Sequence, residues 1–166
     1  MLVISGPSRR KPERPGQPTP IAASALETAR QFFEQQGSFG YEGTAMLAGT
    51  PIHGITRCVI PDQRPYRVGR GVGVEVTDKG KLELAAALAL DERWLARIHS
   101  HPDEAFHSHV DDANRALTAQ SSLSIVVPFF GLGLRRGLEA CAVHIYSGGE
   151  WLPIAPPDVP DHLVVV

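Results

Sequence analysis

Two histidines flank a serine near the middle of the chain, in the segment His99-Ser100-His101-Pro102. At the end of a strand, the two imidazoles of such a segment can converge on one ion if the backbone turns there, and Pro102 favours a turn. Two imidazoles and one carboxylate are an ordinary ligand set for catalytic zinc, which lowers the pKa of a water molecule in the remaining position. The pair alone also fits a polar loop with surface histidines, so it needs further residues to support a metal site.

Ser108 and Asp111, further along the chain, can supply the third ligand. Their spacing lets Ser108 cap a helix whose first turn holds Asp111, which is then directed toward the preceding strand end. The simpler interpretation is a helix cap and nothing more. The functional interpretation makes Asp111 a metal ligand and the Ser108 hydroxyl a donor to a developing oxyanion.

A zinc hydrolase also needs a general base close to the attacking water. Glu42 is the candidate, because it stands at the start of an apolar segment that is typical of a strand. Taken by itself, a glutamate at a strand entry is usually a solvated side chain. Its assignment therefore depends on the rest of the pattern.

The elements that must position these residues follow from periodicity and turn signals. Helices are predicted over 21–36, from 77 and 78 to about 89, and from about 108 to about 121. Strands are predicted over 41–49, 52–61, 72–76, 93–99, 123–130 and 138–146. Residues 62–73, rich in arginine and glycine, are predicted to be a mobile loop. This order indicates an α/β fold with a mixed sheet rather than a regular doubly wound one.

The composition, with 43% hydrophobic and 20% charged residues, is that of one ordinary globular domain. We predict a Pro- and Arg-rich arm over 1–20, a catalytic domain over 21–155 and a tail over 156–166. A formal net charge of -2 argues against nucleic acid as a partner, and the sequence has no apolar run of membrane-spanning length. Cys58 and Cys141 lie in apolar segments and are predicted to be buried thiols in a reducing cytoplasm.

Together these segments resemble the JAMM, or MPN-plus, metalloprotease family. Its signature is a glutamate on an early strand, then H-[S/T]-H-P, then S-x-x-D. The matching segments here are Glu42, His99-Ser100-His101-Pro102 and Ser108-His109-Val110-Asp111. The glutamate strand also matches at Leu47 and Gly49, with Ala45 in place of a usual glycine, and Ile60-Pro61-Asp62-Gln63 resembles the family's I-P-x-Q segment. The resemblance covers residues 21–152.

One spacing departs from the family. Six residues, 102–107, separate the second histidine from the serine, where the family usually has seven. A deletion of one loop residue keeps Ser108 and Asp111 in their roles, and this is the alignment that we prefer. The usual spacing would instead put His109 at the serine position and Asp112 at the ligand position, so Asp112 is the alternative third ligand.

The resemblance implies a mixed sheet flanked by helices, of cytidine-deaminase-like architecture. It implies zinc on His99, His101 and Asp111, with Glu42 as general base and Ser108 stabilising the oxyanion. Members with all these residues cut peptide or isopeptide bonds, commonly those that attach ubiquitin or a ubiquitin-like protein. Similar bacterial members are encoded beside activating and conjugating enzymes in antiphage systems. A catalytically silent MPN scaffold and a small-molecule metallohydrolase are the competing expectations.

Overall fold

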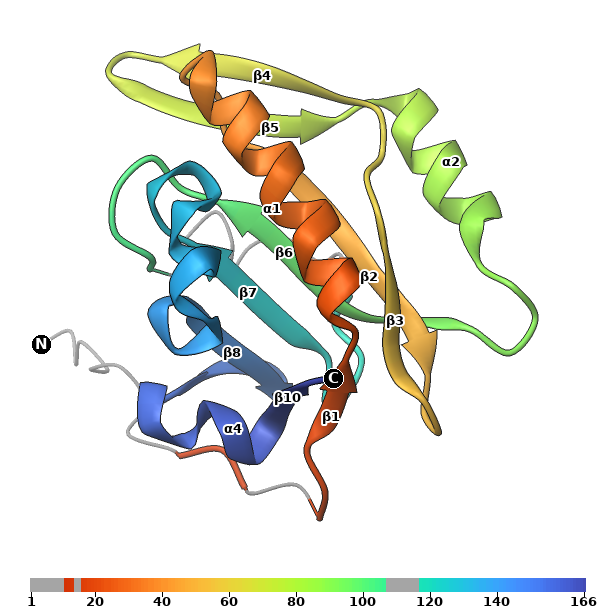
Figure 1. The fold of residues 1–166 in the computed structure, drawn as a ribbon. Helices are drawn as coiled ribbons and strands as arrows, with labels where there is room; N and C mark the ends of the chain where they lie inside the picture. The colour runs from red at the N-terminus through yellow and green to blue at the C-terminus, as the bar shows by residue number, and fades with distance from the viewer. Residues whose placement is uncertain (1–10, 14–15, 107–116) are drawn as a thin grey trace, which may run out of the picture.

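The fold is given by a computed structural model that describes residues 11–13, 16–106 and 117–166. Within these residues, eight strands form a mixed sheet in the order β10-β1-β3-β2-β6-β7-β8-β9 (Figure 1). The central strands are β3 (Gly54–Val59), β2 (Thr44–Thr50), β6 (Arg93–Ser100) and β7 (Leu123–Val127). Strand β2 is antiparallel to both β3 and β6, whereas β6 and β7 are parallel. The predicted mixed α/β sheet flanked by helices is confirmed.

Helix α1 (Ala23–Ser38) covers one face of this sheet (Figure 1). Its apolar residues recur at helical spacing, and Ala25, Ala29 and Phe33 are buried against the strands. From the sheet, the alternate residues of β2 and β6 that point toward α1 join the same core. Those strand residues are Ala45, Leu47, Ala96 and Ile98. The other face of β2 and β6 is left for polar side chains.

The prediction of a mobile loop over 62–73 was wrong. Strands β4 (Gln63–Val68) and β5 (Gly71–Val76) pair in an antiparallel hairpin that forms its own two-stranded sheet. The glycines that suggested a loop make the hairpin possible. Gly69 takes a φ of 59° in the tight turn, and a Cβ on Gly73 would lie 2.5 Å from Cζ of the Tyr66 ring.

Helix α2 (Asp78–Ala87) begins where predicted, with the Thr77 hydroxyl accepting a hydrogen bond from the Gly80 amide at 3.1 Å. Leu84 is half-buried beside the cleft, whereas Leu82 on the outer side of the helix is 73% exposed. Two predicted strands begin or end differently from the expectation. Strand β7 stops before Pro128 and gives way to the 3-10 segment η1 (Phe129–Arg136), while η2 (Leu138–Ala140) precedes β8 (Ala142–Ser147).

The first and last strands lie side by side at one edge of the sheet. Strand β1 (Thr19–Ile21) pairs in parallel with β10 (Leu163–Val165), which follows η3 (Pro156–Asp158) and α4 (Val159–His162). Strand β9 (Glu150–Ile154) forms the opposite edge. Most of the helix predicted over 108–121 lies outside the described residues, and residues 117–121 contain no helix. In the part of the chain that the structure describes, every helix is too short or too polar to cross a membrane.

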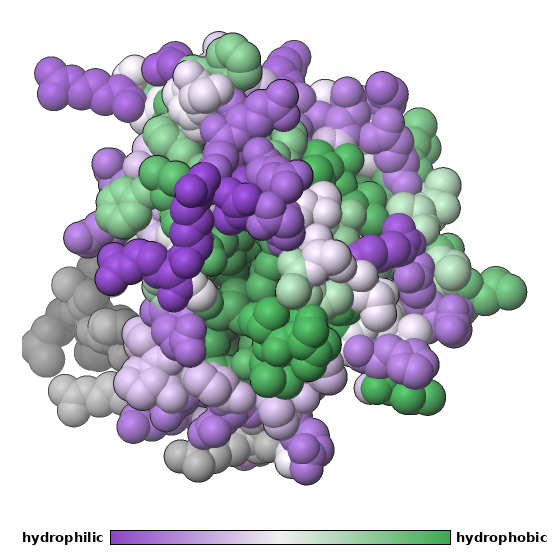
Figure 2. All heavy atoms as spheres, viewed as in Figure 1, coloured by the Kyte–Doolittle hydropathy of each residue, from purple (hydrophilic) through white to green (hydrophobic). Residues whose placement is uncertain are grey.

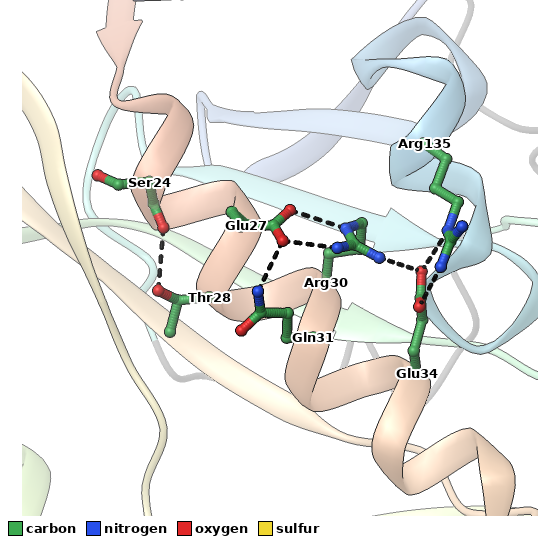
Figure 3. Close-up of polar contacts among 7 residues, drawn as sticks. All are labelled: Ser24, Glu27, Thr28, Arg30, Gln31, Glu34 and Arg135. Atoms are coloured by element: carbon green, nitrogen blue, oxygen red, sulfur yellow. Dashed lines mark hydrogen bonds and ion pairs between the residues drawn. The ribbon is translucent and has the colours of Figure 1, made fainter.

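Helix α1 is fastened to η1 by a network of charged side chains (Figure 3). The Glu34 carboxylate accepts from Arg135 at 2.7 and 2.8 Å and from Arg30 at 2.7 Å. Beside this network, Leu26, Leu134, Leu138 and Val165 line a groove of about 320 Å³, and Figure 2 shows hydrophobic atoms in a hollow on this face. The network matters for the site because η1 also supports the backbone around His101, as described below.

These contacts predict a loss of stability in acid. Hydrogen bonds from Arg135 and then Arg30 lower the pKa of Glu34 from 4.5 to about 2. A depressed carboxyl pKa contributes stability above pH 4.5 that is lost as the pH falls toward about 2. We expect Glu34→Gln to lower the free energy of unfolding at pH 7 by about 1 kcal/mol or less. Urea unfolding at pH 7 and pH 3 checks this, because the difference between wild type and variant should shrink at pH 3.

Candidate functional site

The polar face of β6, turned away from α1, carries Arg97 and His99, and His101 follows the strand end in the same alternation. The intervening residues, Ile98 and Ser100, point into the core and are fully buried. His101 is also largely buried, with 7% of its surface exposed, and His99 is half-buried. Strand geometry therefore delivers both histidines to one side of the sheet, as the H-x-H spacing predicts.

Glu42 is brought to the same place by the neighbouring strand. Thr44 of β2 pairs with His99 of β6. The ladder continues beyond the strand end, because Gly43 accepts from the Ser100 amide at 2.9 Å and donates to the Ser100 hydroxyl at 2.9 Å. One step further along this register, Glu42 lies opposite His101. The sequence-predicted base and both predicted ligands thus line one cleft.

The two imidazoles fit a shared metal ion. Nε2 of His99 lies 3.2 Å from Nε2 of His101, and the ring centroids are 5.0 Å apart. Two nitrogens bound to one tetrahedral zinc at about 2.0–2.1 Å would lie about 3.3 Å apart, so the observed separation suits a zinc ion. Ser108, Asp111 and Asp112 lie outside the described residues. Among the residues that are described, no three His, Cys, Asp or Glu side chains gather as a complete metal site.

The turn after His101 is held by backbone hydrogen bonds from β7 and η1. The His101 amide donates to the Val127 carbonyl at 2.9 Å, and the His101 carbonyl accepts from Phe130 at 2.8 Å. The Phe129 amide donates to Asp103 at 2.9 Å. The Phe106 ring packs edge-on against the His101 ring at 4.7 Å. These contacts fix the imidazole from several sides, which keeps its nitrogen directed toward His99.

Gln63, the first residue of β4, links the hairpin by hydrogen bonds to Thr44, the first residue of β2. Its side-chain amide donates to the Thr44 carbonyl at 2.8 Å and accepts from the Thr44 amide at 2.8 Å. Strand β3 has left β2 at this point, so the side chain of Gln63 replaces the missing strand pairing. This contact gives a structural reason for a glutamine in the Ile60-Pro61-Asp62-Gln63 segment.

We predict that Gln63→Glu weakens the hydrogen bonding between β4 and the start of β2. A carboxylate cannot donate to the Thr44 carbonyl and would repel it, so the free energy of unfolding should fall by about 2 kcal/mol. Since Thr44 lies two residues from Glu42, kcat/KM should also fall, by about tenfold. Urea unfolding and peptidase assays measure the two effects. Gln35→Glu, the same change at an exposed position of α1, is the control, and an equal effect of both variants would contradict the assignment.

The histidines and Glu42 open into a cleft of about 1270 Å³ between the β4–β5 hairpin and the polar face of β2 and β6. Pockets for small molecules usually measure about 300–1,000 Å³. The volume therefore suits a segment of polypeptide better than a small molecule. Met46, Arg97, Pro102 and Phe106 also line the cleft.

Three residues around the cleft make contacts that the sequence analysis did not predict. Ser100 separates the two histidines in the sequence, and its buried hydroxyl also accepts a hydrogen bond from Gly43, next to Glu42. Gln63 was noted only as part of a segment, and Arg97 was not considered. The signal for Ser100 was present, because a small polar residue on the core face of a strand needs a hydrogen-bond partner.

Comparison with known proteins also indicates a metalloprotease. The chain is 37% identical over 114 residues to the probable metalloprotease y4jG of Sinorhizobium fredii, a match that covers 66% of this chain and 70% of the relative. That relative, together with the glutamate and H-S-H-P segments in one cleft, decides the assignment. The chain belongs to the JAMM/MPN-plus family of metalloproteases. No protein-family model matches the chain.

Among solved structures, protein DSY2949 from Desulfitobacterium hafniense matches with a TM-score of 0.53 at 13% identity, covering 89% of this chain and 92% of that one. This likeness shows the fold alone. AF2198, a JAB1/MPN domain protein from Archaeoglobus fulgidus, has a TM-score of 0.47 at 16% identity, covering 88% and 97% of the two chains. As a JAMM/MPN-plus member, the chain is a metal-dependent peptidase. The roles of Glu42, His99 and His101 remain predictions that their shared cleft supports.

Proposed function

We propose that this JAMM/MPN-plus chain hydrolyses the peptide or isopeptide bond that follows the C-terminus of a ubiquitin-like protein, with zinc as its metal. The observation that carries the proposal is the pairing of Gly43 with Ser100, which extends the register so that Glu42 and both histidines line one cleft of about 1270 Å³. His99, His101 and Asp111 would hold the ion, with Asp112 as the alternative third ligand. When bound, zinc supplies Lewis-acid chemistry that lowers the pKa of a water molecule and polarises a carbonyl.

The side chains of Glu42 and Ser108 transfer the proton and stabilise the oxyanion. Glu42, next to His101 in the register, accepts a proton from the attacking water and then delivers it to the leaving amine. If that amine is a lysine side chain, the product is a free ubiquitin-like protein and an unmodified target. The Ser108 hydroxyl donates to the oxyanion that forms on the scissile carbonyl. The turn contacts of His101 keep the site in place while the substrate chain enters the cleft.

The test is cleavage of a ubiquitin-like protein fused through its C-terminal glycine to a second protein. The substrate should be the bacterial ubiquitin-like protein that is encoded nearest this chain. Intact-mass analysis of the products shows whether the cut follows the terminal glycine. Cleavage there by zinc-loaded wild type, and its loss after chelation, is the expected result. An uncut fusion together with cleavage of unrelated peptides would contradict the proposed substrate class.

Two other functions make different predictions. A silent scaffold should bind partners without turnover and should contain no zinc when it is purified without chelator. A small-molecule hydrolase should favour short acyl-amino acids over the fusion, which the volume of the cleft argues against. We also propose that cognate activating and conjugating enzymes are partners, as in antiphage conjugation systems, and that the protein acts in the cytoplasm.

A further inference from the structure

The cleft is lined by arginines on two sides. Arg67 and Arg70 belong to the β4–β5 hairpin, and Arg97 lies on the polar face of β6 beside His99. A chain that reaches the histidines between the hairpin and the sheet must pass these side chains. This concentration of positive charge is local, because the whole chain carries a formal net charge of -2.

Among the described residues, the carboxylates that line the cleft form no ion pair with the two hairpin arginines. Glu75 is paired with Arg64 at 3.0 Å, and Glu42 belongs to the catalytic arrangement. Asp103 also lines the cleft. Within the described residues, neither Arg67 nor Arg70 forms an ion pair. The guanidinium carbon of Arg67 lies 5.6 Å from the centre of the Tyr41 ring.

Arg97 is held in a fixed position at the floor of the cleft. Its guanidinium carbon lies 4.4 Å from the centre of the Trp151 ring, and its Nε donates to the Ser124 hydroxyl at 3.1 Å. It is only 4% exposed. These contacts make Arg97 a fixed part of the cleft wall.

We propose that this cleft selects an acidic segment, so that a substrate with Asp or Glu close to the scissile bond is preferred over a neutral or basic one. This inference rests on the proposed peptidase function. Guanidinium groups bind carboxylates through paired, charge-assisted hydrogen bonds, and a cleft lined by one sign of charge concentrates ligands of the opposite sign. Arg67 and Arg70, the two exposed arginines of the hairpin, supply the recognition.

The experiment uses peptides from the C-terminal tail of the ubiquitin-like protein, extended past the scissile bond. Three versions differ only in carrying Asp, Asn or Lys near that bond. We expect wild type to cut the Asp version with about tenfold higher kcat/KM than the Lys version. The double variant Arg67→Ala/Arg70→Ala should reduce this ratio to about twofold, and Arg70→Glu alone should reduce it as well. Arg136→Ala, at an exposed position outside the cleft, should keep the wild-type ratio.

A binding measurement separates failure of the inference from failure of the proposed function. Fluorescence anisotropy of the same three peptides on Glu42→Gln protein reports recognition without turnover. Equal affinity for all three versions, or a preference that the double variant retains, would overturn the inference. If the Asp peptide binds best but wild type cuts none of the peptides, the charge selection stands and the proposed peptidase reaction is wrong.

Discussion

Glu42→Gln is expected to lower kcat by about 10²- to 10⁴-fold while the protein keeps its metal. The amide has nearly the same shape as the carboxylate, so the hydrogen bonds between Gly43 and Ser100 should persist. The amide cannot accept a proton from the attacking water, which removes the general base and leaves the histidines in place. Steady-state kinetics on the fusion substrate and metal analysis of the same sample measure the two quantities.

The control for this variant is Glu104→Gln, the same change at an exposed position that does not line the cleft. Its kcat should equal that of wild type. Retained turnover in metal-loaded Glu42→Gln protein would contradict the role of Glu42. Loss of both metal and turnover would instead mean that Glu42 supports the metal site itself.

His99→Ala and His101→Ala are expected to abolish activity by preventing metal binding. Each removes one of the two nitrogens that lie 3.2 Å apart, which leaves too few protein ligands for a stable catalytic site. Loss of a supporting contact to a metal ligand typically costs 10- to 100-fold in affinity, and loss of the ligand itself should cost at least about 100-fold. Elemental analysis of the purified variants measures their zinc content.

His53→Ala is the matched control, because His53 is an exposed histidine in the turn between β2 and β3. It should retain both zinc and activity. Circular dichroism of all three variants shows whether any loss follows from unfolding. Full zinc occupancy in folded His99→Ala or His101→Ala protein would remove these histidines from the metal site.

The parts of the site that the sequence could predict are those with a local pattern. His99 and His101 share a strand face because alternate residues of a strand point the same way, and this needs no knowledge of the partner strands. Glu42 could be nominated only through the family resemblance, since its position opposite His101 depends on pairing between segments far apart in the sequence. The helices over 23–38 and 78–87 were predicted because helical periodicity is also a local signal.

The parts that could not be predicted depend on long-range contacts. A strand over 72–76 is predicted from its alternating valines, but its partner β4 is rich in residues typical of loops and is defined only by pairing such as that of Arg67 with Val72. Gln63 has a role only because β3 leaves β2 beside it. Arg97 is a charged residue inside a strand, and its burial could not be anticipated without Trp151 to stack against.

A zinc titration of metal-free protein tests most directly whether a zinc ion and Glu42 together carry the hydrolysis. Activity on the fusion substrate and bound zinc are measured in the same samples. We expect the activity of wild type to rise in proportion to added zinc and to level off at about one ion per chain. Glu42→Gln should take up the same amount of zinc and stay inactive. Full activity in zinc-free wild type, or activity restored to Glu42→Gln by zinc alone, would contradict the central claim that a zinc ion and Glu42 together carry the hydrolysis.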